Sequence, residues 1–262
     1  MIRYPHIDPV LIHLGPLAIR WYGMAYLMGV LLGAVGFKKA VQKTCPLTWD
    51  NVMDLAAMVM LGIVLGGRLG YVLVYDPGYF WQNPGDILAL WQGGMSFHGG
   101  ALGAGLAVLF FAKKNQKPLW PLWDGLALVS TLGIFFGRVA NFINGELYGR
   151  FTTVPWGMVF PAGGLLPRHP SQLYEAVGEG LILGLVLLVL HRRVKPGQLL
   201  AFFVMGYGLI RFCLERFREP DVQVGFLWGG LTMGQYLCLG MVVAGVVLAL
   251  IRSRSLGYDG TS

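Results

Sequence analysis

LALVSTLGIFFGRVANFINGELYGR, residues 126–150, joins an apolar run to a dense polar block. The run ends at Phe136, and the block after it holds two arginines, two asparagines, a glutamate and a tyrosine among glycines. Polar groups at membrane depth are costly unless they are paired or functional. Because a guanidinium binds phosphate through two parallel hydrogen bonds, the block predicts an anion site. The plainer interpretation is a helix end capped by Asn and Gly, with its arginines facing lipid headgroups.

The composition indicates a membrane protein. Of the 262 residues, 55% are hydrophobic and 13% charged, and the mean hydropathy is +0.61, whereas soluble domains carry about 25% charged residues. Apolar stretches of about 20 residues, the length of one bilayer crossing, predict an all-α membrane protein with about seven transmembrane helices. They cover residues 16–37, 52–75, 96–112, 120–142, 173–190, 198–214 and 232–251. No cleavable leader is visible and the connections are short, so we expect a single polytopic domain over residues 1–262.

The basic residues indicate the orientation. All lysines and four of the arginines follow the first, third, fifth and seventh stretches. By the positive-inside rule these segments are cytoplasmic, which places the N-terminus outside and the C-terminus in the cytoplasm. The formal net charge of +7 is therefore mostly a topology signal, and no nucleic-acid partner is expected.

The remaining basic residues are all arginines, within stretches or on the outer side. They are Arg3, Arg20, Arg68, Arg138, Arg150, Arg168, Arg211, Arg216 and Arg218. An arginine-only set favours fixed, two-pronged contacts to an anion, since lysine supplies bulk charge equally well. Pairing with carboxylates is the alternative. The candidate carboxylates are Glu146, Glu175, Glu179 and Glu215. We favour pairing for Arg3 and Arg216, and anion binding for Arg138 and Arg211.

Two outer segments differ from the cytoplasmic connections. Residues 76–94 combine Pro, Gly and aromatic residues, which is typical of a segment at headgroup depth. Residues 144–171 form the longest connection, and their turn and short-strand signals predict a small extracytoplasmic cap within the membrane domain. The three cysteines show neither metal-ligand spacing nor an extracellular pair, so we expect structural thiols and no metal or cofactor.

Five motifs, including the block already described, run along the chain in order. They read RWYG (20–23), GMSFHGG (94–100), GRVANFINGELYGR (137–150), RHPSQLYE (168–175), and RF followed by E and REPD (211–221). Together they resemble the signature of the prolipoprotein diacylglyceryl transferase family over nearly the whole chain. The sequence departs from that pattern at Ala140, where glycine is usual, which puts no role in doubt. Other members can carry His at Arg20, so we assign this residue no catalytic role.

The resemblance implies an enzyme of the bacterial cytoplasmic (inner) membrane with its active site towards the outer, periplasmic side. Such enzymes transfer the diacylglyceryl group of phosphatidylglycerol to the lipobox cysteine thiol of a prolipoprotein signal peptide. A thioether forms and glycerol phosphate leaves, which is the first step of lipoprotein maturation. The expected partners are therefore phosphatidylglycerol, the signal peptide and the surrounding membrane lipids.

The resemblance and this chemistry together indicate three catalytic residues. Arg138 and Arg211 are the expected phosphate clamp, because negative charge builds up on the departing phosphate. His98, beside two glycines that leave room for a substrate, is the expected base, since a pKa near 6.5 suits proton removal from a thiol. A structural histidine bonded to a carbonyl is the plainer interpretation. His169 is the competing base, but capping of the fifth stretch explains it more simply.

Further residues complete the expected lipid site. Tyr22 and Tyr26 share a helix face and can contact ester or glycerol groups, although an interfacial aromatic belt explains Tyr26 equally well. Glu146 is expected to orient an arginine, because a carboxylate beside the phosphate would repel it. Arg218, two turns beyond the second clamp arginine, supports headgroup binding or pairs with Glu215. By resemblance the set also includes Asn141, Asn144 and Gly149.

Three rival interpretations are weaker. Asp124-Gly125 resembles the opening of the CDP-alcohol phosphotransferase motif, but the further metal-binding aspartates are absent. Ser96 faintly resembles a rhomboid serine, but His98 two residues later would face another direction on the helix. An anion or anionic-lipid transporter fits the membrane arginines, yet it should show related halves and polar residues reaching the cytoplasmic side. The non-topological charges cluster on one side, which favours chemistry over passage.

Overall fold

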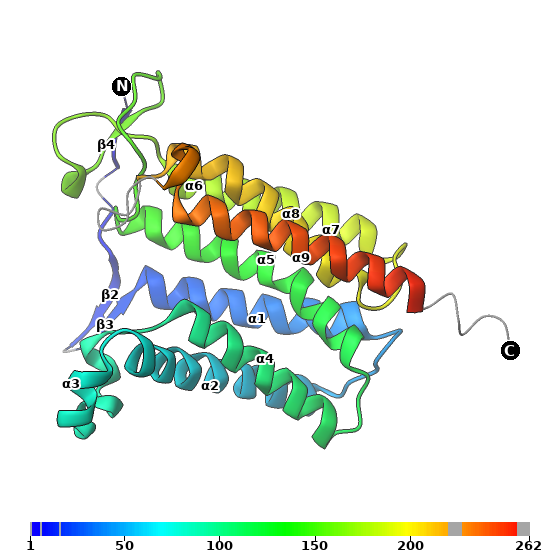
Figure 1. The fold of residues 1–262 in the computed structure, drawn as a ribbon. Coiled ribbons are helices and arrows are strands. Elements are labelled where there is room, and N and C mark those ends of the chain that lie inside the picture. Colours follow the sequence, from blue (N-terminus) through cyan, green and yellow to red (C-terminus); the bar gives the residue numbers. More distant parts are fainter. Residues whose placement is uncertain (1, 6, 16, 220–226, 256–262) are drawn as a thin grey trace, which may run out of the picture. The chain divides into compact units, whose positions relative to one another are not determined.

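The computed structural model describes residues 2–5, 7–15, 17–219 and 227–255, and it is mostly helical (Figure 1). Among these residues, six helices are long and apolar enough to cross a membrane. They are Trp21–Val41, Trp49–Val74, Leu119–Ile143, Ser171–His191, Gln198–Phe217 and Met233–Arg254. The expectation of an all-α membrane protein is therefore confirmed. The third apolar stretch forms a helix of 18 residues, Phe97–Lys114, which is not among the six.

The helices begin and end close to the predicted stretches. They are α1 (Trp21–Val41), α2 (Trp49–Val74), α3 (Pro77–Gln82), α4 (Phe97–Lys114), α5 (Leu119–Ile143), α6 (Ser171–Glu175), α7 (Leu183–His191), α8 (Gln198–Leu214) and α9 (Met233–Ser255). A π-helical turn, Ala176–Ile182, joins α6 to α7 within one span. Its presence had no counterpart in the sequence prediction.

Short strands lie before α1 and in the segment before α6. They are β1 (Ile2–Arg3), β2 (Val10–Leu14), β3 (Leu17–Arg20) and β4 (Met158–Val159). The strand β1 pairs parallel with β4, and β2 pairs antiparallel with β3. The predicted start of the first span at residue 16 is wrong, because residues 17–20 pair with β2 and the helix begins only at Trp21.

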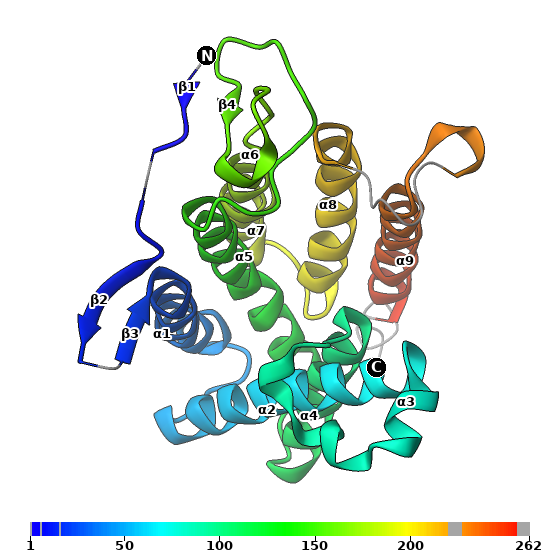
Figure 2. The ribbon, with the colours of Figure 1, turned by 90° about the vertical axis from the view of Figure 1, so that its left-hand side faces the viewer.

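Contacts divide the chain into two compact units, residues 1–40 with 124–262 and residues 41–123. In the first unit α8 and α9 lie side by side (Figures 1 and 2). They approach closely at Gly208 and Gly245, where an added Cβ would meet the backbone of the other helix. Small residues of this kind allow helices to pack tightly in a membrane, where burial of apolar surface cannot drive their association.

Asp124, near the start of α5, fixes the beginning of α8 in the same unit. Its carboxylate accepts hydrogen bonds from the backbone N–H groups of Gly197 (2.6 Å) and Leu200 (2.8 Å). The first N–H groups of a helix have no partner within the helix. The Asp124 side chain therefore supplies from α5 the cap that α8 lacks in its own sequence.

In the second unit α2 and α4 pack through glycines. An added Cβ at Gly66 would collide with the backbone of Gly99, and one at Gly103 would collide with the backbone of Gly62. Gly100 is also packed, against Ile63 of α2. The expectation that Gly99 and Gly100 leave room for a substrate is therefore wrong, because both face a neighbouring helix.

Arg68 organises the segment between α2 and α4. This arginine is only 5% exposed, and it donates hydrogen bonds to the carbonyls of Asp86 (2.5 Å) and Ile87 (2.8 Å). Trp81 and Trp91 of the segment are 90% and 83% exposed. A segment held by Arg68 that exposes its tryptophans fits the expected position at headgroup depth.

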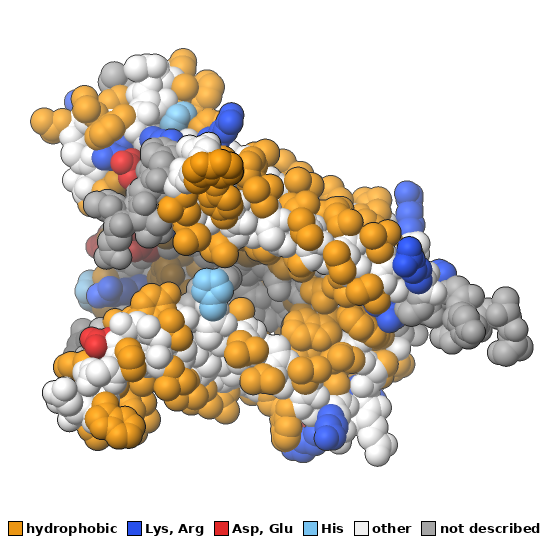
Figure 3. Space-filling view, in the orientation of Figure 1, with side chains coloured by type: hydrophobic (Ala, Val, Ile, Leu, Met, Phe, Trp, Pro, Cys, Tyr) orange, Lys and Arg blue, Asp and Glu red, His pale blue; other side chains and the backbone are white. Residues whose placement is uncertain are grey.

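Hydrophobic side chains cover the sides of the helices in Figure 3. Leu69 of α2, Leu185 of α7 and Leu250 of α9 are among the exposed ones. Continuous apolar surface of this extent is unfavourable in water and favourable against lipid tails. The surface therefore agrees with a multi-pass membrane protein.

Candidate active site

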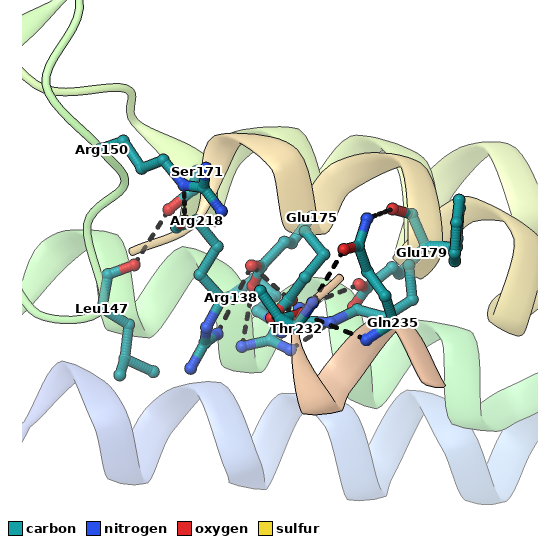
Figure 4. Close-up of polar contacts among 12 residues, drawn as sticks. Arg138, Leu147, Arg150, Ser171, Glu175, Glu179, Arg218, Thr232 and Gln235 are labelled. Atoms are coloured by element: carbon teal, nitrogen blue, oxygen red, sulfur yellow. Dashed lines mark hydrogen bonds and ion pairs between the residues drawn. The ribbon is translucent and has the colours of Figure 1, made fainter. Parts of the chain in front are cut away.

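Four charged side chains from three spans meet in the first unit (Figure 4). A guanidinium nitrogen of Arg138, near the end of α5, lies 2.8 Å from a Glu175 oxygen and 3.5 Å from a Glu179 oxygen. Arg211, in the last turn of α8, lies 2.9 Å from Glu175 and 3.3 Å from Glu179. Each carboxylate contacts both guanidiniums, so the four residues form a closed arginine–glutamate ring.

This ring has a buried side and an accessible side. The side chains of Glu175 and Glu179 are 1% and 0% exposed, whereas those of Arg138 and Arg211 are 19% and 14% exposed. A buried carboxylate is tolerated only when it is paired, and here two guanidiniums neutralise two carboxylates. The arginine side chains are therefore the more exposed members of the ring, and the buried carboxylates hold them in position.

The π-helical turn Ala176–Ile182 brings Glu179 into the ring. Such turns are rare in proteins overall, but those that occur are often found at functional sites. Glycines let it approach its neighbours: an added Cβ at Gly180 would meet the backbone of α5, and one at Gly178 would meet side chains of α8. Glu179 lies between these glycines, so its carboxylate reaches arginines on both helices.

Glu215 and Arg218 extend the ring beyond the end of α8. Arg211 lies 3.0 Å from Glu215, and Arg218 lies 3.5 Å from Glu175. Glu215 also accepts a hydrogen bond from the Thr232 hydroxyl at 3.2 Å. The structure thus brings together four of the predicted site residues: Arg138, Arg211, Glu215 and Arg218. The Glu215 carboxylate pairs with Arg211 and not with Arg218. Anion binding by the arginines stays a prediction.

A second polar group follows the end of α5. The Glu146 carboxylate accepts hydrogen bonds from the side-chain amides of Asn141 (2.8 Å) and Asn144 (3.4 Å). It therefore orients two amides, whereas we expected it to orient an arginine. On α1, the Tyr26 hydroxyl donates to that of Tyr22 at 3.2 Å, which confirms their shared face.

Gly149 lies where two other backbone segments come close. Its N–H donates to the carbonyl of His169 at 2.8 Å, and the residue forms an antiparallel bridge with Arg218. An added Cβ would collide with the carbonyl oxygen of Phe217 and with His169. Only glycine fits this position without displacing the chain that carries Arg218.

The two candidate bases lie in different units. His98 is in the first turn of α4 with an exposed side chain, and its catalytic role stays a prediction. His169 lies just before α6, where its Nδ1 is 3.1 Å from the Tyr174 hydroxyl, which accepts a hydrogen bond from Trp156 at 2.7 Å. Burial lowers the pKa of His169 below its ordinary value of 6.5, so the ring is neutral at pH 7. These contacts support a structural role for His169.

Sequence reasoning missed the central position of Glu175 and Glu179. A signal was present, because two carboxylates four residues apart in an apolar span need partners. Sequence reasoning also did not identify the partners of the other arginines. Arg68, Arg150 and Arg168 donate to backbone carbonyls, which residue type and spacing do not reveal.

Comparison with known proteins points to the same family as the sequence motifs. The profile of the family described as prolipoprotein diacylglyceryl transferase matches residues 9–251. Three relatives bear the name phosphatidylglycerol–prolipoprotein diacylglyceryl transferase. The Rhizobium meliloti protein is 48% identical, over 97% of this chain and 95% of its own length. The Nitratidesulfovibrio vulgaris protein is 50% identical over 95% of each chain, and the Rhodospirillum rubrum protein is 50% identical over 97% and 95%. The chain therefore belongs to the prolipoprotein diacylglyceryl transferase family.

Proposed function

We propose that this chain transfers the diacylglyceryl group of phosphatidylglycerol to the lipobox cysteine thiol of prolipoprotein signal peptides. Membership of the family and the names of the relatives support the reaction and both substrates. The observation that carries the site is the arginine–glutamate ring, which fixes two guanidiniums side by side among apolar spans.

In this proposal the two guanidiniums of the ring stabilise the negative charge that builds up on the departing phosphate. The thiolate sulfur attacks the glyceryl carbon, and the new C–S bond forms as the C–O bond to the phosphate breaks. The electron pair of that bond leaves with glycerol phosphate. Arg138 and Arg211 donate their remaining N–H groups to the phosphate, and Arg218 supports the headgroup. Because buried Glu175 and Glu179 hold the guanidiniums in advance, little reorganisation is needed as charge develops.

The acceptor thiol must lose its proton before it attacks. A free cysteine has a pKa of about 8.5 and is mostly protonated at neutral pH. We assign this proton to the imidazole of His98, because histidine is the side chain that most often acts as a general base.

The remaining predicted residues are assigned to the rest of the lipid. The phenols of Tyr22 and Tyr26 bind its ester or glycerol oxygens. The amides of Asn141 and Asn144, oriented by Glu146, donate to the headgroup. The other members of the site are Gly149, which positions the chain around it, and Glu215, which orients Arg211.

For the membrane arrangement we propose seven spans, with α4 as the third. The N-terminus lies outside and the C-terminus in the cytoplasm, and the site faces the outer side of the bacterial inner membrane. Lysines in the last turns of α1 and α4, and in the connections after α1, α4 and α7, support this orientation through the positive-inside rule. We further propose one membrane domain in residues 1–262, with residues 144–171 as its extracytoplasmic cap and no nucleic-acid partner.

Transfer of labelled diacylglyceryl tests the proposal directly. Purified protein in detergent is given phosphatidylglycerol, labelled in its diacylglyceryl part, and a peptide with a lipobox cysteine. We expect label on the peptide, none on a matched peptide with Ser in place of that Cys, and release of glycerol phosphate. Folded, lipid-supplied protein that labels neither peptide would contradict the proposed function.

A further inference from the structure

Arg218 reaches the ring from a backbone that no helix holds. α8 ends at Leu214, a single 3-10 turn covers Glu215–Phe217, and Arg218 is extended at φ −85° and ψ 147°. Its guanidinium nevertheless lies 3.5 Å from Glu175. The position of the Arg218 guanidinium therefore depends on the contacts that fix the backbone of residues 217–219.

The predicted cap holds that backbone on one side. Gly149 bridges Arg218, and the Arg150 N–H donates to the carbonyl of Phe217 at 2.9 Å. The Arg150 side chain adds a 2.6 Å hydrogen bond from Nε to the carbonyl of Arg218, drawn in Figure 4. Residues 149–150 thus form a short edge against which the chain around Arg218 is aligned.

Arg168 ties this edge to the residue after Arg218. Its Nη1 lies 3.1 Å from the carbonyl oxygen of Gly149 and 2.7 Å from the carboxylate of Glu219. One guanidinium nitrogen therefore joins the cap edge to the end of residues 217–219.

The Arg168 guanidinium also contacts two aromatic rings and a further backbone carbonyl. It lies 3.9 Å from the ring centre of Phe151 and 5.0 Å from that of Tyr148. Its Nε donates to the carbonyl of Gly163 at 2.9 Å, and the side chain is 12% exposed. A planar fork that stacks and donates in several directions is specific to arginine, because the lysine ammonium is a point charge on a flexible stem.

We propose that Arg168 is a positioning residue for the lipid site, which acts through Arg218. Together with Glu219 it clamps residues 217–219 onto the cap edge and so fixes the Arg218 guanidinium beside Glu175. This rests on the proposed function, since Arg218 is assigned there to the lipid headgroup. Arg168 itself bonds to protein groups and touches neither substrate.

Kinetics and hydrogen exchange on the full-length protein test this proposal separately. The variants are Arg168→Lys, Glu219→Ala, Arg218→Gln and the double variant Arg168→Lys/Arg218→Gln. Arg216→Gln is the matched control, because Arg216 lies on the same segment, is exposed and has no role in the site. Glu219 is 46% exposed, so its replacement by Ala leaves the core intact.

We expect Arg168→Lys to raise KM for phosphatidylglycerol about tenfold, with KM for the peptide unchanged, and Glu219→Ala to act in the same direction. In the Arg218→Gln background the added effect of Arg168→Lys should fall below about twofold, because both changes remove the same contact. Amide exchange at Gly149–Arg150 should rise in both single variants of the clamp and stay unchanged in Arg216→Gln.

Two results would overturn the inference. One is an Arg168→Lys effect of equal size with and without Arg218, which would show that Arg168 acts by another route. The other is unchanged exchange at Gly149–Arg150 in both clamp variants, which would show that no clamp exists. The exchange result holds whether or not the intact protein transfers lipid, so a failure of the proposed function is distinguished from a failure of this inference.

Discussion

Arginine side chains in this protein have two uses, which depend on the groups opposite them. Arg138 and Arg211 face buried carboxylates, and their side chains stay 19% and 14% exposed. Arg68 and Arg168 face backbone carbonyls and hold loops in place. Replacement of any of these arginines should impair activity, but for different reasons. Replacement of Arg138 or Arg211 removes a positive charge from the site, whereas replacement of Arg68 or Arg168 displaces the backbone that the side chain holds.

A single methyl group at Gly149 tests how tightly the chain around Arg218 is placed. Gly149→Ala would push its Cβ into the carbonyl oxygen of Phe217, so the bridge to Arg218 must open. Displacement of a binding group by about 1 Å can lower a rate about a hundredfold. We therefore expect a fall of that order in diacylglyceryl transfer, measured with phosphatidylglycerol and the lipobox peptide.

Gly240→Ala provides the control for this change. An added Cβ at Gly240 of α9 meets no atom within 4 Å, so transfer should remain at the level of the intact protein. Wild-type rates in both variants would show that the close approach at Gly149 has no bearing on the site.

At the scale of elements, α8 depends on a cap supplied by α5. Asp124→Ala would leave the N–H groups of Gly197 and Leu200 without their carboxylate partner. An unsatisfied buried donor costs about 1–3 kcal/mol, so the free energy of unfolding should fall by at least that amount. Titration with SDS in mixed micelles measures it. Asp124→Asn keeps one acceptor oxygen and should lose less, and equal stability of all three proteins would contradict the cap.

The apolar helices were largely predictable from sequence. Residues 120–142 and 198–214 were predicted as spans and form α5 (119–143) and α8 (198–214), because hydrophobic length alone determines a membrane helix. The β2–β3 hairpin was not predicted, since its residues are as apolar as the start of a span. The π-helical turn was also missed, because it depends on packing of Gly180 against α5 and not on composition.

The site was predictable in part for similar reasons. Motifs and residue type led to Arg138 and Arg211, and the structure places both in one ring. The pairing could not be predicted from sequence, because four carboxylates were candidate partners of the arginines: Glu146, Glu175, Glu179 and Glu215. Which carboxylate faces which arginine is decided by the folding of α5, α6 and α8 against each other.

At the scale of the whole molecule, the described residues form a multi-pass membrane protein with a polar site in apolar surroundings. Six candidate spans carry exposed hydrophobic side chains, and three of those in the first unit bring two guanidiniums and two carboxylates together. Neutral pairing makes such a cluster tolerable within a membrane. The same pairing holds the two arginine side chains, which stay partly exposed, and we propose that they bind the phospholipid phosphate.

The most direct test of this account is the transfer rate of Arg138→Gln and Arg211→Gln beside Arg216→Gln, each purified and shown to be folded. If the ring arginines hold the departing phosphate, the first two variants should lose about a hundred- to a thousandfold in rate, as enzymes do when one such donor is removed. The Arg216→Gln variant should match the intact protein. Near-normal transfer by folded Arg138→Gln and Arg211→Gln would contradict the account and place the phosphate elsewhere.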